Sequence, residues 1–374
     1  MSAQLLVLLT IALIPLCGVM CAITPFLMPK DECFTVTIPE SAQSDERLKA
    51  LKRKYLIVML VVTAVCTLLI AVLYPNCLEQ SDSIMFSIVY TIATLIPVAL
   101  SFVLMLVNRR RVQKIKQQEG WQATTQQAAA VISSAADIPE PINIRWNILY
   151  IPLFVVIAMA TYLLYPLMPE QIPMQVDLAG NVTSSVAKTP ITASFGLIVC
   201  IIIAACFIFC HWGIVNSKRV VNPQKAVSSA YSYGVFARSQ SIIMLAFGLL
   251  LCAAIGLLIP LASVGVITIL QAAVIILGIS LMFVVVVFVV CLRYGQSGAR
   301  IFKDGSGTDG MPRDDDKYWK LGVFYVNAQD PAVFVPKRFG FGWTLNFGRP
   351  KTWLIVIGFI VVLGAFIAAC EAVF

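Results

Sequence analysis

"VITILQAAVIILGISLMFVVVVFVVCL", residues 266–292, contains no Asp, Glu, Lys, Arg or His. A hydrocarbon layer about 30 Å thick is crossed by about 20 apolar residues of α-helix, so this run predicts a transmembrane helix. With seven similar runs, the sequence predicts an all-α polytopic membrane protein with about eight transmembrane helices. The runs cover residues 4–28, 55–74, 84–107, 148–167, 191–215, 241–261, 266–292 and 352–373.

The composition of the chain predicts the same class. Hydrophobic residues make up 59% of the sequence and charged residues 12%, against roughly 45–50% and 25% in a soluble domain. The first run, residues 4–28, has no basic residue before it and is too long for the apolar part of a secretory signal. We therefore expect this run to remain in the protein as a helix.

The positions of Lys and Arg predict the orientation of the helices. All of them except Lys188 fall in four segments, 30–54, 108–146, 217–239 and 293–351. The positive-inside rule assigns these segments to the cytoplasm and both termini to the outside. The net charge of +8 is then complementary to anionic lipid of the inner leaflet and does not indicate nucleic-acid binding.

This topology divides the chain into five parts. They are residues 1–107, three helices with a cytoplasmic segment at 30–54; 108–147, a cytoplasmic linker; 148–292, four helices with an outer loop at 168–190; 293–351, a linker and a cytoplasmic β module; and 352–374, the last helix.

Catalytic and metal chemistry have little support in the sequence. The spans contain no Asp, and the one His of the chain, His211, follows Cys206 and Cys210 without a fourth ligand. Intramembrane aspartyl, serine and zinc proteases need residues that are missing here. We therefore predict that the protein is not an enzyme and has no catalytic residue, metal or cofactor.

Two polar motifs before the last helix have ordinary interpretations. Residues 305–310 read GSGTDG, which matches G-x-G-x-x-G, but no strand precedes them and no helix follows. We interpret them as a linker. Asp304, Asp309 and the aspartates at 314–316 lack the spacing and the closing Glu of a Ca²⁺ loop, and are predicted to form a solvated acidic turn.

The β module is predicted from "YWKLGVFYVNAQDPAVFVPKRFGFGWTLNFG", residues 318–348. Residues 321–326 and 332–335 are rich in β-branched and aromatic side chains and flank a turn-like sequence, which predicts a hairpin. Residues 343–345 are a third strand candidate. Residues 34–38 also alternate like a strand, and we predict that they pair with 321–326 or 332–335, because an unpaired edge is a liability.

Aromatic and basic side chains of this module suit the membrane boundary. Trp319 and Trp343 are expected in the headgroup zone, where amphipathic rings gather. For Lys337 and Arg338, lipid phosphate is the favoured partner and a carboxylate of the bundle is the alternative. The candidate functional residues of the module are Trp319, Lys337, Arg338, Trp343 and Asn346.

Two stretches resemble known families. Residues 314–353, "DDDKYWKLGVFYVNAQDPAVFVPKRFGFGWTLNFGRPKTW", resemble domain-of-unknown-function family 5808. Residues 149–190 resemble domain-of-unknown-function family 1648, whose outer loop has a Pro, an Ile-Pro, then His, Asp and Gly, and a closing Lys. That domain occurs in SdpI-like immunity and signalling proteins, so the resemblance implies a bacterial cell membrane. The matching positions are Pro169, Ile172, Pro173, Asp177, Gly180 and Lys188.

The outer loop also has a physical interpretation. Gln175 stands where the family has His, which argues against a metal or proton role. Pro173 stiffens the entry to the loop, and Asp177 to Asn181 has the composition of a turn in which Gly180 is free to adopt a positive φ. Recognition of an external ligand and a structural plug over the helix ends are equally favoured. The candidate ligand-binding residues are Pro173, Gln175, Asp177, Gly180 and Lys188.

These observations favour an integral membrane sensor or immunity-type protein. It would recognise an external peptide or an envelope component and couple this to the cytoplasmic side through a protein partner. A transporter or permease subunit for an uncharged or lipid-like solute is one alternative, and a structural scaffold is another. The lipid bilayer is the partner that every one of these functions requires.

Overall fold

The chain is folded as a bundle of membrane helices. In the described part of the chain, eight helices are long and apolar enough to cross a membrane, which confirms the predicted class. Strands occur there only as four two-stranded sheets. The computed structural model describes residues 2–79, 83–123, 138–177, 180–219, 226–302, 311 and 314–373.

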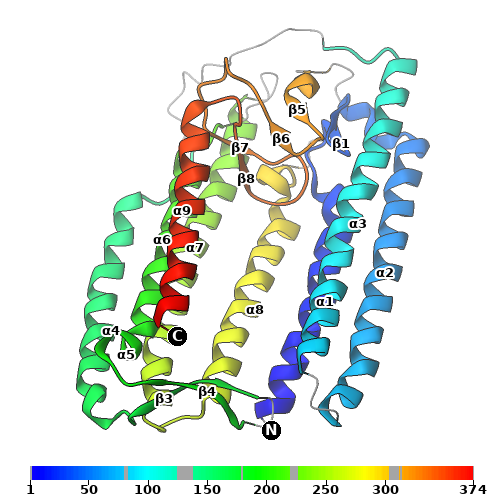
Figure 1. Ribbon diagram of the computed structural model, residues 1–374. Helices are drawn as coiled ribbons and strands as arrows, with labels where there is room; N and C mark the ends of the chain where they lie inside the picture. The colour runs from blue at the N-terminus through cyan, green and yellow to red at the C-terminus, as the bar shows by residue number, and fades with distance from the viewer. Residues whose placement is uncertain are drawn as a thin grey trace.

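The elements follow one another in the order of Figure 1. The membrane helices are α1 (Ser2–Leu27), α2 (Glu46–Glu79), α3 (Ser83–Gln118), α4 (Tyr150–Leu164), α6 (Phe195–Val215), α7 (Ala226–Ser263), α8 (Ile269–Tyr294) and α9 (Pro350–Val373). The strands are β1 (Glu32–Cys33), β2 (Val36–Thr37), β3 (Gln171–Val176), β4 (Val182–Ala187), β5 (Trp319–Lys320), β6 (Phe324–Tyr325), β7 (Phe334–Pro336) and β8 (Trp343–Leu345). The short helices are η1 (Glu40–Ser44), η2 (Ile144–Leu149), η3 (Tyr165–Leu167), α5 (Pro190–Ala193), η5 (Gln296–Gly298) and η6 (Asp316–Tyr318).

The long helices form two groups that share α8. Helices α1, α2 and α3 pack together as the first group, and α4, α6 and α7 pack together as the second group. Helix α8 contacts α1 on one side and α7 on the other (Figure 1). It therefore lies between the two groups.

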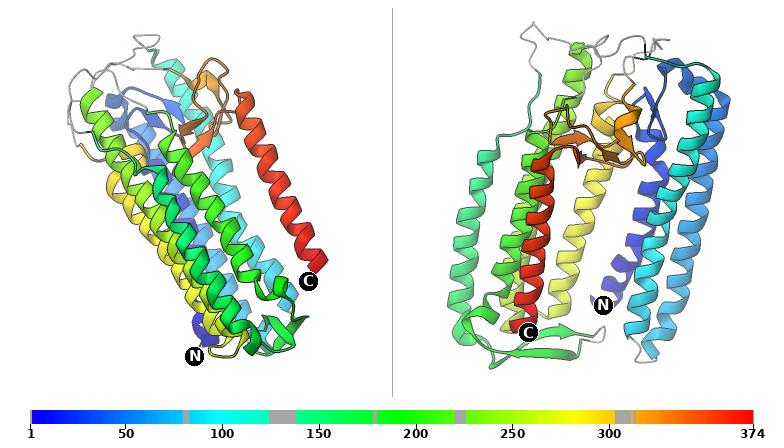
Figure 2. Two further views of the ribbon diagram at one scale, coloured as in Figure 1. Left: turned by 90° about the vertical axis from the view of Figure 1, so that its left-hand side faces the viewer. Right: turned by 45° about the horizontal axis from the view of Figure 1, so that its top comes forward.

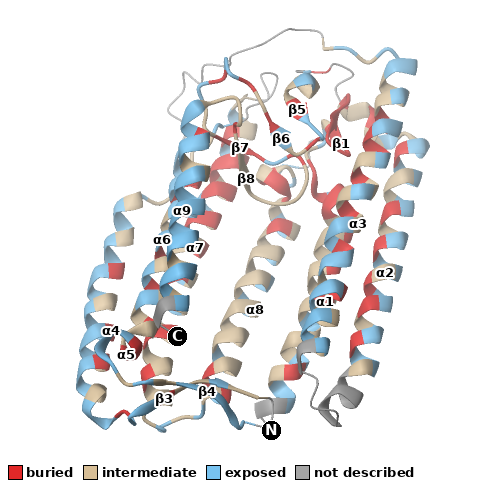
Figure 3. Ribbon diagram, viewed as in Figure 1, coloured by how far each residue is buried: buried red, intermediate tan, exposed pale blue. Residues whose placement is uncertain are grey.

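Small residues let the helices of the second group approach one another closely. A Cβ atom added at Gly256 of α7 would lie 2.4 Å from Cδ1 of Ile157 on α4. One added at Gly248 would lie 2.0 Å from the hydroxyl of Tyr150. Membrane helices gain most of their association energy from such packing, because lipid is as apolar as their side chains. Figure 3 shows the buried residues along these inner faces.

Helix α9 stands apart from both groups. Its most apolar window contains no buried residue, and Figure 2 shows the helix leaning away from the bundle. Its first turn is held by the module, since the hydroxyl of Thr352 donates to the carbonyl of Asn346 at 2.6 Å. Its apolar side chains therefore face lipid.

The two ends of the bundle carry different small sheets. The β1–β2 hairpin and strands β5 to β8 lie at the end where the basic segments gather, and the β3–β4 hairpin lies at the opposite end (Figure 1). We call these the basic end and the outer end. The positive-inside rule assigns the basic end to the cytoplasm.

Three helices extend beyond the hydrocarbon layer. Helices α2, α3 and α7 contain 34, 36 and 38 residues, which at 1.5 Å per residue is roughly 50–57 Å. Hydrocarbon takes only about 30 Å of that length. The extra turns support the β module, residues 314–349, above the membrane.

Candidate functional site at the basic end

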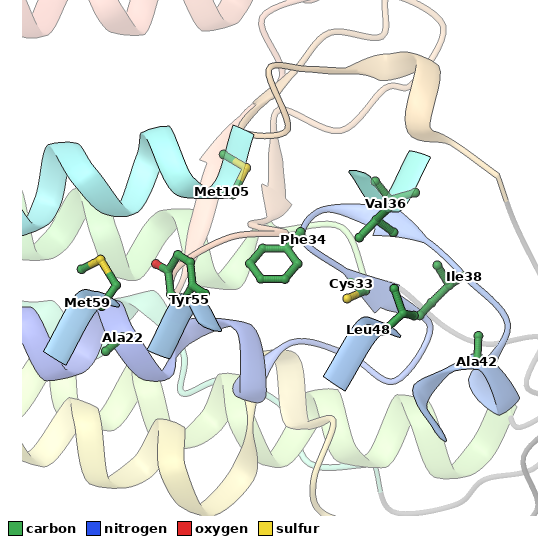
Figure 4. Close-up of a cluster of buried hydrophobic side chains, with 11 residues drawn as sticks. Ala22, Cys33, Phe34, Val36, Ile38, Ala42, Leu48, Tyr55, Met59 and Met105 are labelled. Atoms are coloured by element: carbon green, nitrogen blue, oxygen red, sulfur yellow. The ribbon is translucent and has the colours of Figure 1, made fainter. Parts of the chain in front are cut away.

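A strained turn lies at the centre of the basic end. Strands β1 and β2 pair at Cys33 and Val36, and the two residues between them, Phe34 and Thr35, have φ of 44° and 66°. Hairpin turns of this kind normally use Asn-Gly, and a β-branched residue at positive φ costs of order 1–3 kcal/mol. The ring of Phe34 packs on the ring of Tyr55 of α2 at 5.6 Å (Figure 4). Tertiary packing therefore holds the turn.

Two arginines converge on the backbone of this turn. Arg109 of α3 and Arg338 of the β7–β8 loop each donate from Nη1 to the carbonyl of Thr35, at 2.6 Å and 2.9 Å. Arg109 also donates to the carbonyl of Trp319 at 3.2 Å. The side chain of Arg338 is only 3% exposed. A backbone carbonyl from the start of the chain thus binds guanidinium groups from two distant segments.

Carboxylates surround Arg338. Its Nη1 lies 2.5 Å from Oδ1 of Asp316, its Nε lies 3.3 Å from Oε1 of Glu32, and its Nη2 binds Asp315. Breaking such a buried pair by removing one partner costs about 3–5 kcal/mol, because the other charge stays buried. We call Glu32, Thr35, Arg109, Asp316 and Arg338 the arginine cluster.

The pKa of the Asp316 carboxyl group is strongly lowered. Burial alone raises the pKa of its carboxyl group, but the charge of Arg338 and the hydrogen bond from Lys116 at 2.8 Å outweigh burial and lower the pKa to about 2. The backbone N–H and the hydroxyl of Thr37 also donate to this carboxylate, at 3.0 Å and 2.8 Å. Asp316 is therefore charged in the folded protein at neutral pH.

The cluster corrects three expectations about the β module. The aspartates at 315 and 316 do not form a solvated turn, because they bind Arg338 and Lys116. Arg338 binds carboxylates and not lipid phosphate. Trp319 is buried beneath the guanidinium of Arg338, which lies 5.2 Å from its ring centre, and so it is not in the headgroup zone. Asp304, Asp309 and the GSGTDG motif lie outside the described residues.

The strand pairing predicted for residues 34–38 is wrong. Val36 and Thr37 pair with β1 in their own hairpin, and Thr37 reaches the β module through hydrogen bonds with Asp316 and Arg338. The predicted hairpin of 321–326 with 332–335 is wrong as well. Instead β5 pairs with β6 and β7 pairs with β8. Each of the four short strands β5 to β8 forms its backbone hydrogen bonds with the strand next to it in the sequence. Alternation of apolar and polar residues predicts strands but not which strands pair.

A second set of contacts binds the module to the second helix group. The ring of Phe334 lies over Gly213 of α6, where an added Cβ would be 3.1 Å from it. The indole N–H of Trp343 donates to the hydroxyl of Tyr233 on α7 at 3.1 Å, so Trp343 lies against this helix. Lys218 forms an ion pair with Asp330 at 2.5 Å. The module therefore connects both helix groups.

Asn346 is the internal hydrogen-bond centre of the module. Its side chain is fully buried and donates to the carbonyls of Asn327, Asp330 and Ala332 at 2.9–3.2 Å. Its Oδ1 accepts from the N–H groups of Asn327 and Gly348. The segment between the two hairpins is thereby fixed. Lys337, in contrast, is exposed.

The outer candidate residues lie on or beside the β3–β4 hairpin. The carboxylate of Asp177 accepts from the N–H and the side-chain amide of Asn181, and Gly180 has φ of 93°, so the turn forms as expected. Gln175 is exposed, and the register shifts around it and Pro173.

Lys188, the last outer candidate, is used within the fold. Its ammonium donates to the carbonyl of Met168 at 2.9 Å and lies 4.8 Å from the ring centre of Tyr165. It therefore fixes the base of the hairpin and is separated from the exposed turn.

His211 has a structural role. Its side chain is fully buried, with Nε2 3.0 Å from the carbonyl of Ile142 and Nδ1 3.0 Å from the amide of Asn147. It thus holds the segment that enters α4 against α6. Cys206 and Cys210 are exposed on the surface of α6, and no group of three or more potential metal ligands occurs among the described residues.

The sequence interpretation missed Arg109, Glu32 and Thr35. Arg109, Arg110 and Arg111 form a basic run at the end of an apolar span, a pattern typical of a membrane anchor. Helical periodicity distinguishes them, because Arg109 follows the buried Met105 by four residues and precedes the buried Val112 by three. That spacing places Arg109 on the packed face of α3 and was available in the sequence.

Comparison with known proteins adds one finding. Residues 328–353 match the model of a family of unknown function, DUF5808. No curated protein and no solved structure matches the chain significantly. The matched segment contains Asp330, Phe334, Arg338 and Trp343, which bind the module to the bundle, and Asn346, which holds the module together. The chain is therefore a multi-span helical membrane protein that carries a segment similar to this family.

Proposed function

We propose that the protein is a non-catalytic sensor in a bacterial cell membrane. It recognises an external peptide or an envelope component with the β3–β4 hairpin and transmits binding to a protein partner at the β module. The observation that carries the proposal is the double attachment of the module, by the arginine cluster to the first helix group and by Phe334, Trp343 and Asp330 to the second. A module attached in this way responds to a change in the relative position of the groups.

The outer hairpin is joined to the same helices. Ile172 of β3 is buried with Met168 and Ala193, and Val264, which follows α7, packs against them. A ligand that displaces the hairpin therefore acts on the outer ends of α6 and α7. The inner ends of these helices carry Gly213 and Tyr233, which contact the module.

The resemblance of residues 149–190 to family 1648 and to SdpI-like proteins supports the same proposal. The exposed side chains of β4 and of Gln175 offer polar groups and a free strand edge, to which an extended peptide can add backbone hydrogen bonds.

A photo-crosslinking amino acid at Gln175, in the membranes of the source organism, tests recognition, and one at Lys320 serves as the inner control. We expect position 175 to capture a peptide or an envelope component. Adding that component to the purified chain in nanodiscs should change hydrogen exchange of residues 319–346. Capture without any change in the module would leave the hairpin as a structural plug, and no capture would reject the recognition step.

The orientation has a separate test. In a chain without its native cysteines, Thr183→Cys should react with an impermeant thiol reagent added to intact cells, and Lys320→Cys should react only after lysis. Labelling of position 320 in intact cells would reverse the topology on which the proposal depends.

A further inference from the structure

Five cations on neighbouring helices of the first group are exposed, and the described part of the chain offers them no ion-pair or hydrogen-bond partner. They lie near the basic ends of α2 and α3. Other cations on the same two helices differ, since Arg47, Lys49 and Lys116 each bind a carboxylate within 2.9 Å. The five residues are Arg53, Lys54, Arg110, Arg111 and Lys114.

These cations continue the lipid-facing stripes of their helices. On α2, Arg53 and Lys54 lie one turn before Ile57 and Val58, which are 51% and 39% exposed in a membrane-spanning helix. On α3, exposed Val103 and Val107 are followed at helical spacing by Arg110, Arg111 and Lys114. The charged groups therefore point to the same side as side chains that contact lipid tails.

The depth of the cations fits the headgroup layer. Arg110 lies three residues beyond Val107 and Lys114 lies seven beyond it, or about 5 Å and 10 Å at 1.5 Å per residue. The interfacial region adds roughly 5–8 Å to each side of the hydrocarbon. The backbone of Lys114 lies just beyond this layer, and its long side chain reaches back into it. Helix α2 ends and α3 begins at the outer end of the bundle (Figure 1). Arg53 and Arg110 are about equally many residues from that end, so the charges of both helices lie at the same depth.

We infer that Arg53, Lys54, Arg110, Arg111 and Lys114 form a binding site for the phosphate headgroups of anionic phospholipid. Helices α2 and α3 pack side by side (Figure 1), so the site spans two helices and admits more than one phosphate. Arginine donates two parallel hydrogen bonds to a phosphate, which favours a bound lipid over a diffuse cloud of counterions.

The site also adjoins the arginine cluster. Arg109, which holds the Thr35 turn, precedes Arg110 directly, and Lys116 lies two residues after Lys114. A lipid bound on the outer face of α3 therefore fixes the helix whose inner face binds the β module. This inference does not depend on the proposed sensor function.

The test measures lipid retained by the full-length chain. Wild type is equilibrated with mixed micelles of phosphatidylglycerol and phosphatidylcholine, and bound lipid is counted by native mass spectrometry. We expect selective retention of phosphatidylglycerol. The triple variant Arg110→Gln, Arg111→Gln and Lys114→Gln should weaken retention on the order of a hundredfold, at about fivefold for each cation.

Matched variants distinguish a specific lipid-binding site from a general effect of positive charge on lipid retention. Lys317→Gln with Lys320→Gln removes two exposed cations from the module and should leave retention unchanged. Arg110→Lys keeps the charge but loses the paired hydrogen bonds, so it should weaken retention, though by less than Arg110→Gln. Equal retention by the triple variant and wild type, or no preference for phosphatidylglycerol in wild type, would overturn the inference.

A crosslinking experiment on wild type covers the case in which the triple variant does not fold. Photoactivatable phosphatidylglycerol should label peptides that contain residues 53–54 or 110–114. Labelling confined to other peptides would likewise overturn the inference.

Discussion

Arg338→Met is the most informative change in the β module. The substitution keeps an unbranched side chain of similar length and removes the charge that faces Glu32 and Asp316, whose side chains are 2% and 15% exposed. The hydrogen bonds to the carbonyl of Thr35 and the hydroxyl of Thr37, at 2.9 Å and 3.0 Å, are lost as well. Leaving buried charge without its partner costs about 3–5 kcal/mol.

The expected result is local opening of the module. Because Phe334 and Trp343 still bind the second helix group, we expect the module to detach from the first group while the membrane helices remain folded. Hydrogen exchange of residues 314–348 in nanodiscs should accelerate by a hundredfold or more, which corresponds to about 3 kcal/mol. Exchange in the peptides of α6 should stay within a few fold of wild type.

Two further variants test whether charge pairing holds the module. Lys337→Ala changes the exposed neighbour and should shift the opening free energy by less than about 0.5 kcal/mol. Adding Glu32→Gln and Asp316→Asn to Arg338→Met removes the stranded charges and should restore part of the protection. If Arg338→Met exchanges like wild type, or if the added changes only worsen it, the cluster does not hold the module through charge pairing.

Three other predictions follow from measured contacts. The pKa of Asp316 is lowered from 3.8 to about 2, so the stability that it contributes, about 2 kcal/mol, should be complete above pH 4 and be lost as the pH falls towards 2; Asp316→Asn should abolish this part of an acid titration of module exchange. Asn346→Ala removes five hydrogen bonds and should cost roughly 3 kcal/mol in the same exchange assay, given the cost of unsatisfied buried groups; wild-type exchange would contradict its central role. Gly180→Val forces a β-branched residue to φ of 93° and Asp177→Ala removes the turn hydrogen bonds, so both should increase proteolysis of the outer hairpin by about tenfold at unchanged membrane insertion; intact hairpins in both would contradict the turn assignment.

The membrane helices could be predicted because the bilayer imposes one strong constraint. Backbone groups in hydrocarbon must form their hydrogen bonds within the helix, and a transmembrane span must be apolar over about 20 residues. Residues 266–292 meet both conditions and can therefore be recognised as a span from the sequence. The outer turn at Asp177–Gly180 could also be predicted, because Asp, Asn and Gly favour the backbone conformations of turns. Both rules act over short stretches of chain.

The arginine cluster depends on contacts that no short stretch contains. Phe34 and Thr35 are poor choices for a tight turn on local preference, and only packing on Tyr55 and the two arginines explains them. Asp316 was expected in solvent because its neighbours are acidic. Its partner Arg338 lies 22 residues away and Thr37 lies 279 residues away, beyond the reach of a local pattern.

This separation has a consequence for biosynthesis. The bond from Arg338 to Thr35 joins residues 303 positions apart, so the ribosome makes the turn 303 residues before it makes Arg338. At about 5–20 residues per second, roughly 15–60 seconds pass in between. During that interval the first three helices are already inserted with Glu32 and Arg109 unmatched by the module. Synthesis of residues 314–338 is thus the step that completes the arginine cluster, and a ribosome stalled before residue 338 holds a bundle in which the Thr35 turn still lacks the guanidinium of Arg338.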